Sequence, residues 1–194
     1  MKILICHFLL LLFLTPQAEA IQLELDEQDV KEALEYGRDR RDLPHPEVLK
    51  KWRVDLGYGV GSASVVTPFG RLAILSKEMA GRFREPTEGE IKEALGELKG
   101  RLVFGCSLYG DDLSFADEYD VTLLYKDKKL KPSEKETPGS AKFTRSYPES
   151  PRYWALCFFK FDMPDLDPNA KVTLILKNGD GKELLFPFDL SKLR

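Results

Sequence analysis

An α+β fold is expected from this chain, with an N-terminal helical segment packed on a C-terminal antiparallel β-sandwich. Apolar residues recur at helical spacing before about residue 100, and after it they alternate as in β-strands. Several short strands with polar turns are typical of an immunoglobulin-like architecture, which the second half could adopt. We divide the chain into a leader (1–20), a mainly helical segment (21–100) and a β-sandwich domain (101–194).

Residues 1–20 have the pattern of a secretory signal peptide. Lys2 precedes an apolar run from Ile3 to Leu14, and Ala18-Glu19-Ala20 supplies the small residues that a signal peptidase needs. The run is shorter than the roughly 20 apolar residues of a permanent membrane helix. We therefore expect cleavage before Ile21 and an exported chain, periplasmic or secreted, with no membrane span after cleavage.

Helices are expected at four places before residue 100. Apolar side chains recur every three to four residues over Asp26–Arg40, and one or two further turns fit Pro46–Val54. Thr67 followed by Pro68 is a favourable helix start, because threonine caps the first turn and proline fits the first helical position. Thr87-Glu88-Gly89-Glu90 matches a capping box, which opens the last helix.

Five main strands are expected after residue 100. The third is apolar on both faces and is therefore placed at the centre of a sheet. The last two are joined by the turn residues Asn178-Gly179-Asp180-Gly181, and a weaker strand is expected near Lys142–Arg145. The main strands are Leu102–Tyr109, Tyr119–Tyr125, Tyr153–Phe161, Val172–Leu176 and Glu183–Phe188.

Composition excludes some classes of partner. The formal net charge is −3, so the chain has no basic excess with which to neutralise phosphates, and we expect no nucleic-acid partner. Two separated cysteines and His45 follow no zinc-ligand spacing, and we expect neither a metal site nor a cofactor.

Cys106 and Cys157 are the cysteines that remain after the leader is removed. An even pair in an exported chain is typical of a disulfide, which would stabilise the fold by roughly 4 kcal/mol. Both residues also lie in apolar, strand-like runs, where a free cysteine acts as a small hydrophobic side chain. The sequence leaves the two alternatives open.

One glycine-rich segment is the candidate for ligand contact. Glycines at alternate positions let a backbone bend or let a ligand approach closely, and a helix start follows, where anions are favoured. The segment matches neither a dinucleotide-binding fingerprint nor a P-loop, so a structural role is the alternative. The candidate ligand-binding residues are Gly57, Gly59, Gly61, Ser62, Ser64 and Arg71.

Catalytic chemistry has weak support. His45, between two prolines, is the single histidine outside the leader and would have to serve any nucleophile alone. Acidic residues crowd two loops without an EF-hand spacing, and turn capping explains them equally well. They are Asp111, Asp112, Asp117, Glu118 and Asp120 in one loop, and Asp162, Asp165, Asp167 and Asn169 in the other.

Two functions follow as hypotheses. The first is a non-catalytic binding or interaction module of the cell envelope, whose partner is an unknown protein or an envelope polymer. Exposed aromatic side chains would anchor that partner, and the candidates are Tyr109, Tyr147, Tyr153 and Trp154. The alternative is a carboxylate-dependent hydrolase, assisted by Ca²⁺, that acts on an envelope or extracellular polymer.

Overall fold

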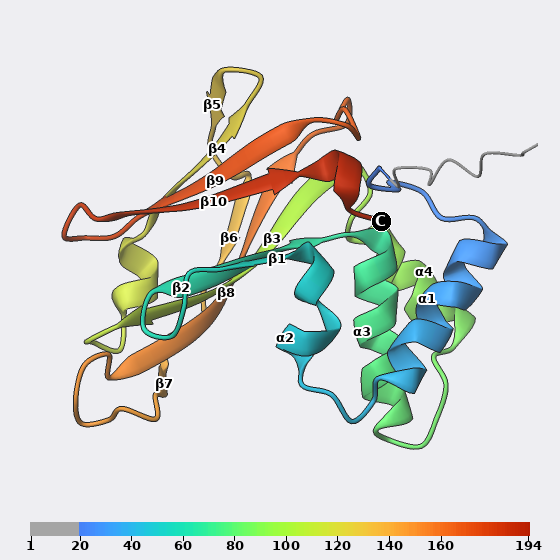
Figure 1. Ribbon diagram of the computed structural model, residues 1–194, viewed down its shortest axis with the longest axis horizontal. Coiled ribbons are helices and arrows are strands. Elements are labelled where there is room, and N and C mark those ends of the chain that lie inside the picture. Colours follow the sequence, from blue (N-terminus) through green and yellow to red (C-terminus); the bar gives the residue numbers. More distant parts are fainter. Residues whose placement is uncertain (1–19) are drawn as a thin grey trace, which may run out of the picture.

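The computed structural model describes residues 20–194 (Figure 1). The signal-peptide prediction falls on residues that lie outside this range, apart from Ala20. The helices are α1 (Glu27–Asp39), α2 (His45–Val48), α3 (Pro68–Ala80) and α4 (Glu88–Gly96), with the 3₁₀ turns η1 (Lys50–Trp52), η2 (Phe115–Glu118) and η3 (Leu190–Lys192). The strands are β1 (Arg53–Asp55), β2 (Gly61–Val66), β3 (Arg101–Gly110), β4 (Asp120–Tyr125), β5 (Lys128–Leu130), β6 (Glu134–Glu136), β7 (Lys142–Phe143), β8 (Tyr153–Asp162), β9 (Lys171–Lys177) and β10 (Glu183–Asp189).

The strands form two antiparallel sheets. The first has the order β1-β2-β3-β8-β6, with β7 also paired to β8, and the second has the order β10-β9-β4-β5. The longest pairing joins β3 to β8 over ten residue pairs, from Arg101↔Asp162 to Gly110↔Tyr153. The expected α+β class with helices beside an antiparallel sandwich is confirmed, and β8 is an inner strand of its sheet.

The core lies between the two sheets. Alternate residues of β3 are fully buried, and Phe104 on this strand packs against Phe161 of β8 and Phe188 of β10, with ring centroids 5.9 and 5.5 Å apart. Because successive side chains of a strand point to opposite faces, the other half of β3 and β8 points away from this core. The outer face of the first sheet therefore has to be covered or left open.

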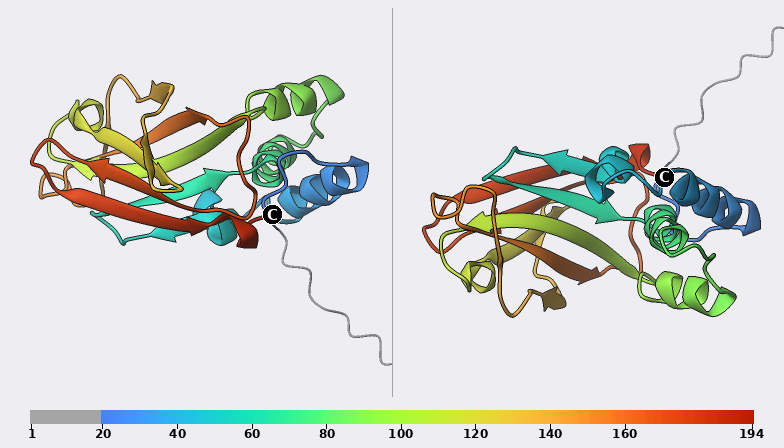
Figure 2. Two further views of the ribbon diagram at one scale, coloured as in Figure 1. Left: turned by 90° about the horizontal axis from the view of Figure 1, so that it is seen from above. Right: turned by 90° about the horizontal axis from the view of Figure 1, so that it is seen from below.

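The helices pack at one end of the sandwich, as both views in Figure 2 show. Helices α1 and α3 approach each other closely at Gly37, where an added Cβ would lie 2.0 Å from the Ala73 carbonyl oxygen. Glycine is therefore required there for steric reasons. The rings of Tyr36, Trp52 and Phe69 fill the space beside this contact, with centroids 5.8 to 6.1 Å apart.

The helical segment 21–100 also supplies two strands of the first sheet. β2 pairs with β3 over six residues, from Gly61↔Leu108 to Val66↔Val103, and β1 continues the sheet beyond it. Periodicity does not reveal β2 because the strand is buried on both faces and its small residues give no alternation of apolar and polar side chains. The strands therefore join the segment before residue 100 to the sandwich.

None of the helices within residues 20–194 combines the length and the apolar character that crossing a bilayer requires.

Candidate functional site

A groove of about 590 Å³ lies over the outer face of the first sheet, between the sheet and the helices α2, α3 and α4. Its floor is made of small residues that face each other across β2 and β3. Ser62 is paired with Ser107, and Ser64 is paired with Gly105. None of these positions carries a large side chain, and the ring of Phe158 lies over Gly105, where an added Cβ would be 3.2 Å from the ring.

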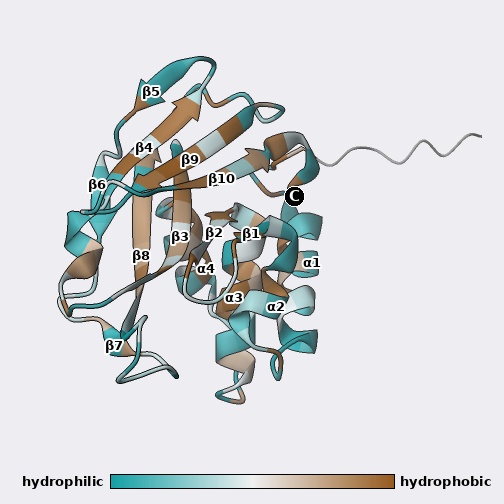
Figure 3. Ribbon diagram, turned by 60° about the vertical axis from the view of Figure 1, so that its left-hand side comes forward, coloured by the Kyte–Doolittle hydropathy of each residue, from teal (hydrophilic) through white to brown (hydrophobic). Residues whose placement is uncertain are grey.

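Apolar side chains form both walls of the groove. On one side stand the outward-facing residues of β8, which are Trp154, Leu156 and Phe158. On the other side lie Leu49 after α2 and Ile74 on α3. Leu156 is 46% exposed, so the apolar surface remains open to solvent. Figure 3 shows that β3 and β8 are apolar strands.

Four basic side chains of the described residues form ion pairs that border the groove, and three of them are more buried than their acidic partners, the exception being His45 with Glu78. The Arg53 side chain is 19% exposed and its partner Asp55 is 53% exposed, with 3.0 Å between Nη2 and Oδ2. For Arg71 and Glu97 the values are 30% and 54%, and for Lys160 and Glu136 they are 17% and 49%. The cationic side chains of these three pairs are therefore less exposed to solvent than the carboxylates that neutralise them.

Arg53 is anchored in the floor of the groove. Its Nη2 donates a hydrogen bond to the Ser62 hydroxyl at 2.8 Å as well as pairing with Asp55. Its Nε is buried and has no hydrogen-bond partner, and no other buried side-chain nitrogen or oxygen of residues 20–194 is in this position. Buried polar groups are normally satisfied, so this guanidinium has hydrogen-bonding capacity left over.

The candidate residues from the glycine-rich segment are divided by the structure. Ser62, Ser64 and Arg71 line the groove. Gly57 and Gly59 lie in the turn between β1 and β2, with φ angles of 100° and 78°, a region that glycine favours. Gly61 opens β2 with φ of 145°, and the glycines are not among the residues that line the groove.

Aromatic side chains continue from the groove toward the end of the sandwich away from the helices. Tyr109 is paired with Trp154 across β3 and β8, and its ring lies 5.3 Å from that of Tyr58. The rings of Phe143, Tyr147 and Tyr153 form a second cluster. Within it, Phe143 is 62% exposed. Sequence reasoning missed Phe143, Leu156 and Phe158, because only the pairing of β8 shows which of its faces is open.

The carboxylates of the acidic loops are engaged in hydrogen bonds and ion pairs within the protein. Asp111 accepts hydrogen bonds from the Arg152 amide and the Ser150 hydroxyl, which lower the pKa of its carboxyl group. The Lys131 ammonium likewise lowers the pKa of Asp120, and the Asn169 amide lowers that of Asp167. Within residues 20–194, no three histidine, cysteine or acidic side chains group together in a way that would hold a metal ion.

His45 stands at the rim of the groove, at the first position of α2. Its Nε2 lies 3.4 Å from Glu78 Oε1, and about half of each side chain is exposed. No hydrogen bond joins this imidazole to a serine or cysteine in the described part of the chain. The arrangement is that of a surface ion pair.

Cys106 and Cys157 occupy directly opposed positions of β3 and β8. Of the two alternatives left by the sequence, the structure has free thiols, and both are fully buried in the sandwich core. Burial raises the pKa of Cys157 to about 11 and that of Cys106 well above its usual range. A thiol in this state is a poor nucleophile.

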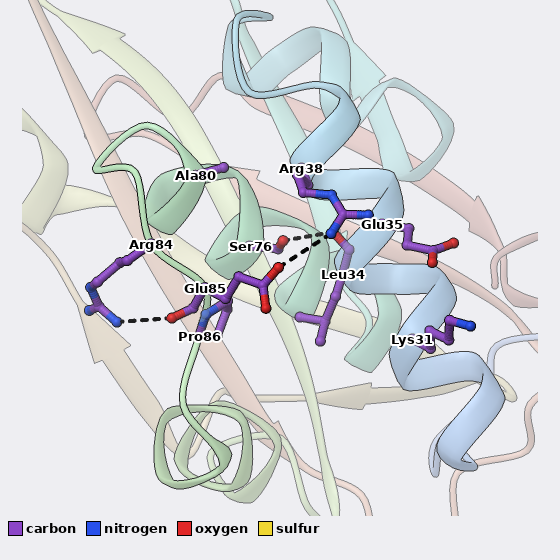
Figure 4. A pocket seen from close by; sticks show the side chains of 9 residues that line it. All are labelled: Lys31, Leu34, Glu35, Arg38, Ser76, Ala80, Arg84, Glu85 and Pro86. Carbon is purple, nitrogen blue, oxygen red and sulfur yellow. Dashed lines mark hydrogen bonds and ion pairs between the residues drawn. The ribbon is translucent and has the colours of Figure 1, made fainter.

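A smaller hollow of about 220 Å³ lies between α1, α3 and residues 84–86 (Figure 4). Its wall includes the ion pair between Arg38 Nη1 and Glu85 Oε1, 3.4 Å apart, and Glu85 is 81% exposed. Exposed ion pairs of this kind are weak and mobile. The larger groove on the sheet is therefore the candidate functional site.

No protein-family model matches the chain, and no curated protein matches it significantly. Among solved structures it is similar to the archaellum periplasmic stator protein FlaG from Sulfolobus acidocaldarius, with a TM-score of 0.30 and 13% identity, covering 46% of this chain and 87% of that one. The FlaF and FlaG stator complex from the same organism gives the same TM-score and identity, covering 46% of this chain and 78% of that one. A TM-score of 0.30 is too low to assign a fold or a function from either protein.

Proposed function

We propose that this chain is an exported, non-catalytic binding module of the cell envelope, and that it binds an envelope component in the groove on the first sheet. The observation that carries the proposal is the open apolar wall of β8 above a floor of small residues. Ligand sites are typically concave and mostly apolar, with a few polar groups that orient the ligand. Export is supported by the signal-peptide pattern of residues 1–20.

A binding role fits the groove better than a catalytic one. The hydroxyls of Ser62, Ser64 and Ser107 have no general base bonded to them in the described structure, and nucleophilic catalysis needs such a base. The cysteine thiols lie in the core, away from solvent. The groove offers contact surface, and its polar groups are suited to orienting a bound molecule.

The alternative, a carboxylate-dependent hydrolase assisted by Ca²⁺, has less support. General acids of this class need a carboxyl group with a raised pKa. The carboxyl groups of Asp111, Asp120 and Asp167 have lowered pKa values because each accepts hydrogen bonds or pairs with a lysine. These side chains therefore remain ionised and serve as turn and surface charges.

Photo-crosslinking tests the proposed function directly. A photoreactive phenylalanine analogue replaces Leu156 in the groove wall, and a matched control variant carries it at Leu185 on β10 of the second sheet. The two leucines are 46% and 51% exposed, so both probes are equally accessible to solvent. The variants are produced in an exporting host and irradiated in intact cells.

We expect a discrete crosslinked product from the Leu156 variant, at a defined added mass, and none from the Leu185 variant. Equal labelling from both positions would mean nonspecific contact and would overturn the groove as the binding site. Absence of any product from Leu156 in the exported protein would count against the binding function itself.

A further inference from the structure

The ion pairs around the groove indicate what kind of ligand it accepts. Three of the four basic side chains are less exposed than their carboxylate partners, and in the pair of His45 with Glu78 the two are similarly exposed, at 51% and 43%. The exposed fractions are 17–30% for the cations Arg53, Arg71 and Lys160, and 49–54% for Asp55, Glu97 and Glu136. Glu97 and Glu136 line the groove, whereas Asp55 is not among its lining residues.

An anionic group that enters the groove would compete with carboxylates whose side chains are about half exposed to solvent. Exposed ion pairs contribute little, because solvent screens them and ordering two long side chains costs entropy. A carboxylate seated deeper would meet the same guanidinium in a less polar environment and could bond it at two points. A cationic ligand would find no comparably buried carboxylate along the groove.

The uncharged part of the ligand is defined by the walls. Trp154, Leu156 and Phe158 form a continuous row along β8, since they occupy alternate positions of one strand. Ile74 and Leu49 face this row across a floor of small side chains. A groove lined by such a continuous apolar row fits an unbranched chain better than a compact polar molecule such as a free sugar.

We propose that the groove binds a carboxylic acid with an unbranched apolar chain. The chain lies along the outer face of β8, and the carboxylate is held by the cations at the groove, with Arg53 as the principal partner. Arg53 is assigned this role because it lines the groove and its guanidinium is fixed to Ser62 in the floor. This ligand assignment rests on the proposed function, since it names the class of molecule that the same groove would bind.

Intrinsic fluorescence provides a direct assay. Trp52 is 2% exposed, and Trp154 lines the groove, so a ligand there changes mainly the emission of Trp154. The protein from Ile21 onward is titrated with dodecanoate, dodecanol and dodecyltrimethylammonium, each below its micelle concentration. We expect dodecanoate to bind at least tenfold more tightly than dodecanol, and the ammonium compound to bind most weakly.

Three variants locate the binding. Arg53→Met keeps much of the apolar stem and removes the charge, and it should weaken dodecanoate fivefold or more while leaving dodecanol nearly unchanged. Ser107→Leu fills the floor and should weaken both ligands. Lys192→Met, which removes a cation whose side chain is 76% exposed away from the groove, is the matched control and should change neither. Circular dichroism and the urea midpoint of each variant show whether it is folded.

Equal affinity for dodecanoate and dodecanol would overturn the acid assignment, as would an Arg53→Met protein that is folded and binds dodecanoate normally. If Arg53→Met fails to fold, Lys160→Met is used for the same comparison of dodecanoate with dodecanol. A folded Lys160→Met protein that prefers dodecanoate as strongly as the native protein would again overturn the acid assignment. Crosslinking at Leu156 without dodecanoate binding would remove this ligand class and leave the proposed function standing. Failure of both experiments would remove the function as well.

Discussion

The Arg194 guanidinium lies 2.6 Å from Asp29, joining the end of this sequence to the first turn of α1. The Asp29 side chain is 12% exposed, and its carboxylate also completes the capping box of this helix by accepting from the Asp26 amide. The hydrogen bond from Arg194 is the largest cause of the lowered pKa of Asp29. The pair therefore contributes to the capping of α1, to the packing of Arg194 against this helix and to the pH dependence of stability.

Asp29→Asn should lower the free energy of unfolding by about 1–3 kcal/mol at pH 7, because it removes a charged hydrogen bond at a mostly buried site. Since the folded pKa of Asp29 is lowered, this stabilisation is present above the unfolded carboxyl pKa of about 3.9 and is lost as the pH falls through the folded pKa. The free energy of unfolding, measured with urea at pH 7 and at low pH, should change less with pH for the variant than for the native protein. Asp42→Asn, at a side chain 91% exposed, is the control and should behave as native.

Gly37→Val should destabilise the protein by at least about 2 kcal/mol, because the new Cβ would collide with the Ala73 backbone and push α1 from α3. Thermal unfolding followed by circular dichroism measures the effect. The comparison is Gly96→Ala in α4, where an added Cβ has open space and should stabilise the helix by up to about 1 kcal/mol. A native-like melting curve for Gly37→Val would contradict the close helix contact.

Thr67→Val should cost about 1–3 kcal/mol, although it hardly changes side-chain volume. The buried Thr67 hydroxyl accepts from the Gly70 amide at 3.0 Å, as the N-cap of α3, and donates to the Arg194 carbonyl at 2.9 Å. Thr173→Val, on the half-exposed outer side of β9, should change stability by no more than about 0.5 kcal/mol. Denaturant midpoints that shift equally for both variants would rule out this role for Thr67.

Cys106 and Cys157 should resist alkylation in the native protein, because both thiols are buried and their pKa values are raised. Mass spectrometry of the chain from Ile21 onward after iodoacetamide treatment at pH 8 should show no added group without denaturant, and two added groups in denaturant without reductant. Protein that is labelled only after reduction would show that the two facing thiols had become a disulfide. The same experiment on protein from an exporting host tests whether the disulfide forms when the chain is exported.

The local elements of this fold follow from short-range chemistry. Thr67 and Pro68 start α3, Thr87 and Glu90 form the capping box of α4, and the alternation of apolar residues predicts the strands after residue 100. These signals depend on hydrogen bonds and side-chain spacing within a few residues, so the sequence alone reveals them. In the acidic loops, Asp167 makes such a local contact with the Asn169 amide, whereas Asp111 bonds Ser150 and Arg152, which are distant in the sequence.

Tertiary structure decided the site. The groove joins residues from 45–78, 97–107 and 136–160, and nothing in the order of the sequence shows that these lie together. Ser62 and Ser64 were singled out with the neighbouring glycines, but only the pairing of β2 with β3 places the serines in a floor and the glycines 57 and 59 in a turn. Likewise, only the pairing of β8 shows that Trp154, Leu156 and Phe158 line the groove on the outer face of the sheet. Local hydrogen bonding thus determined the elements, and long-range burial determined which of their faces could bind.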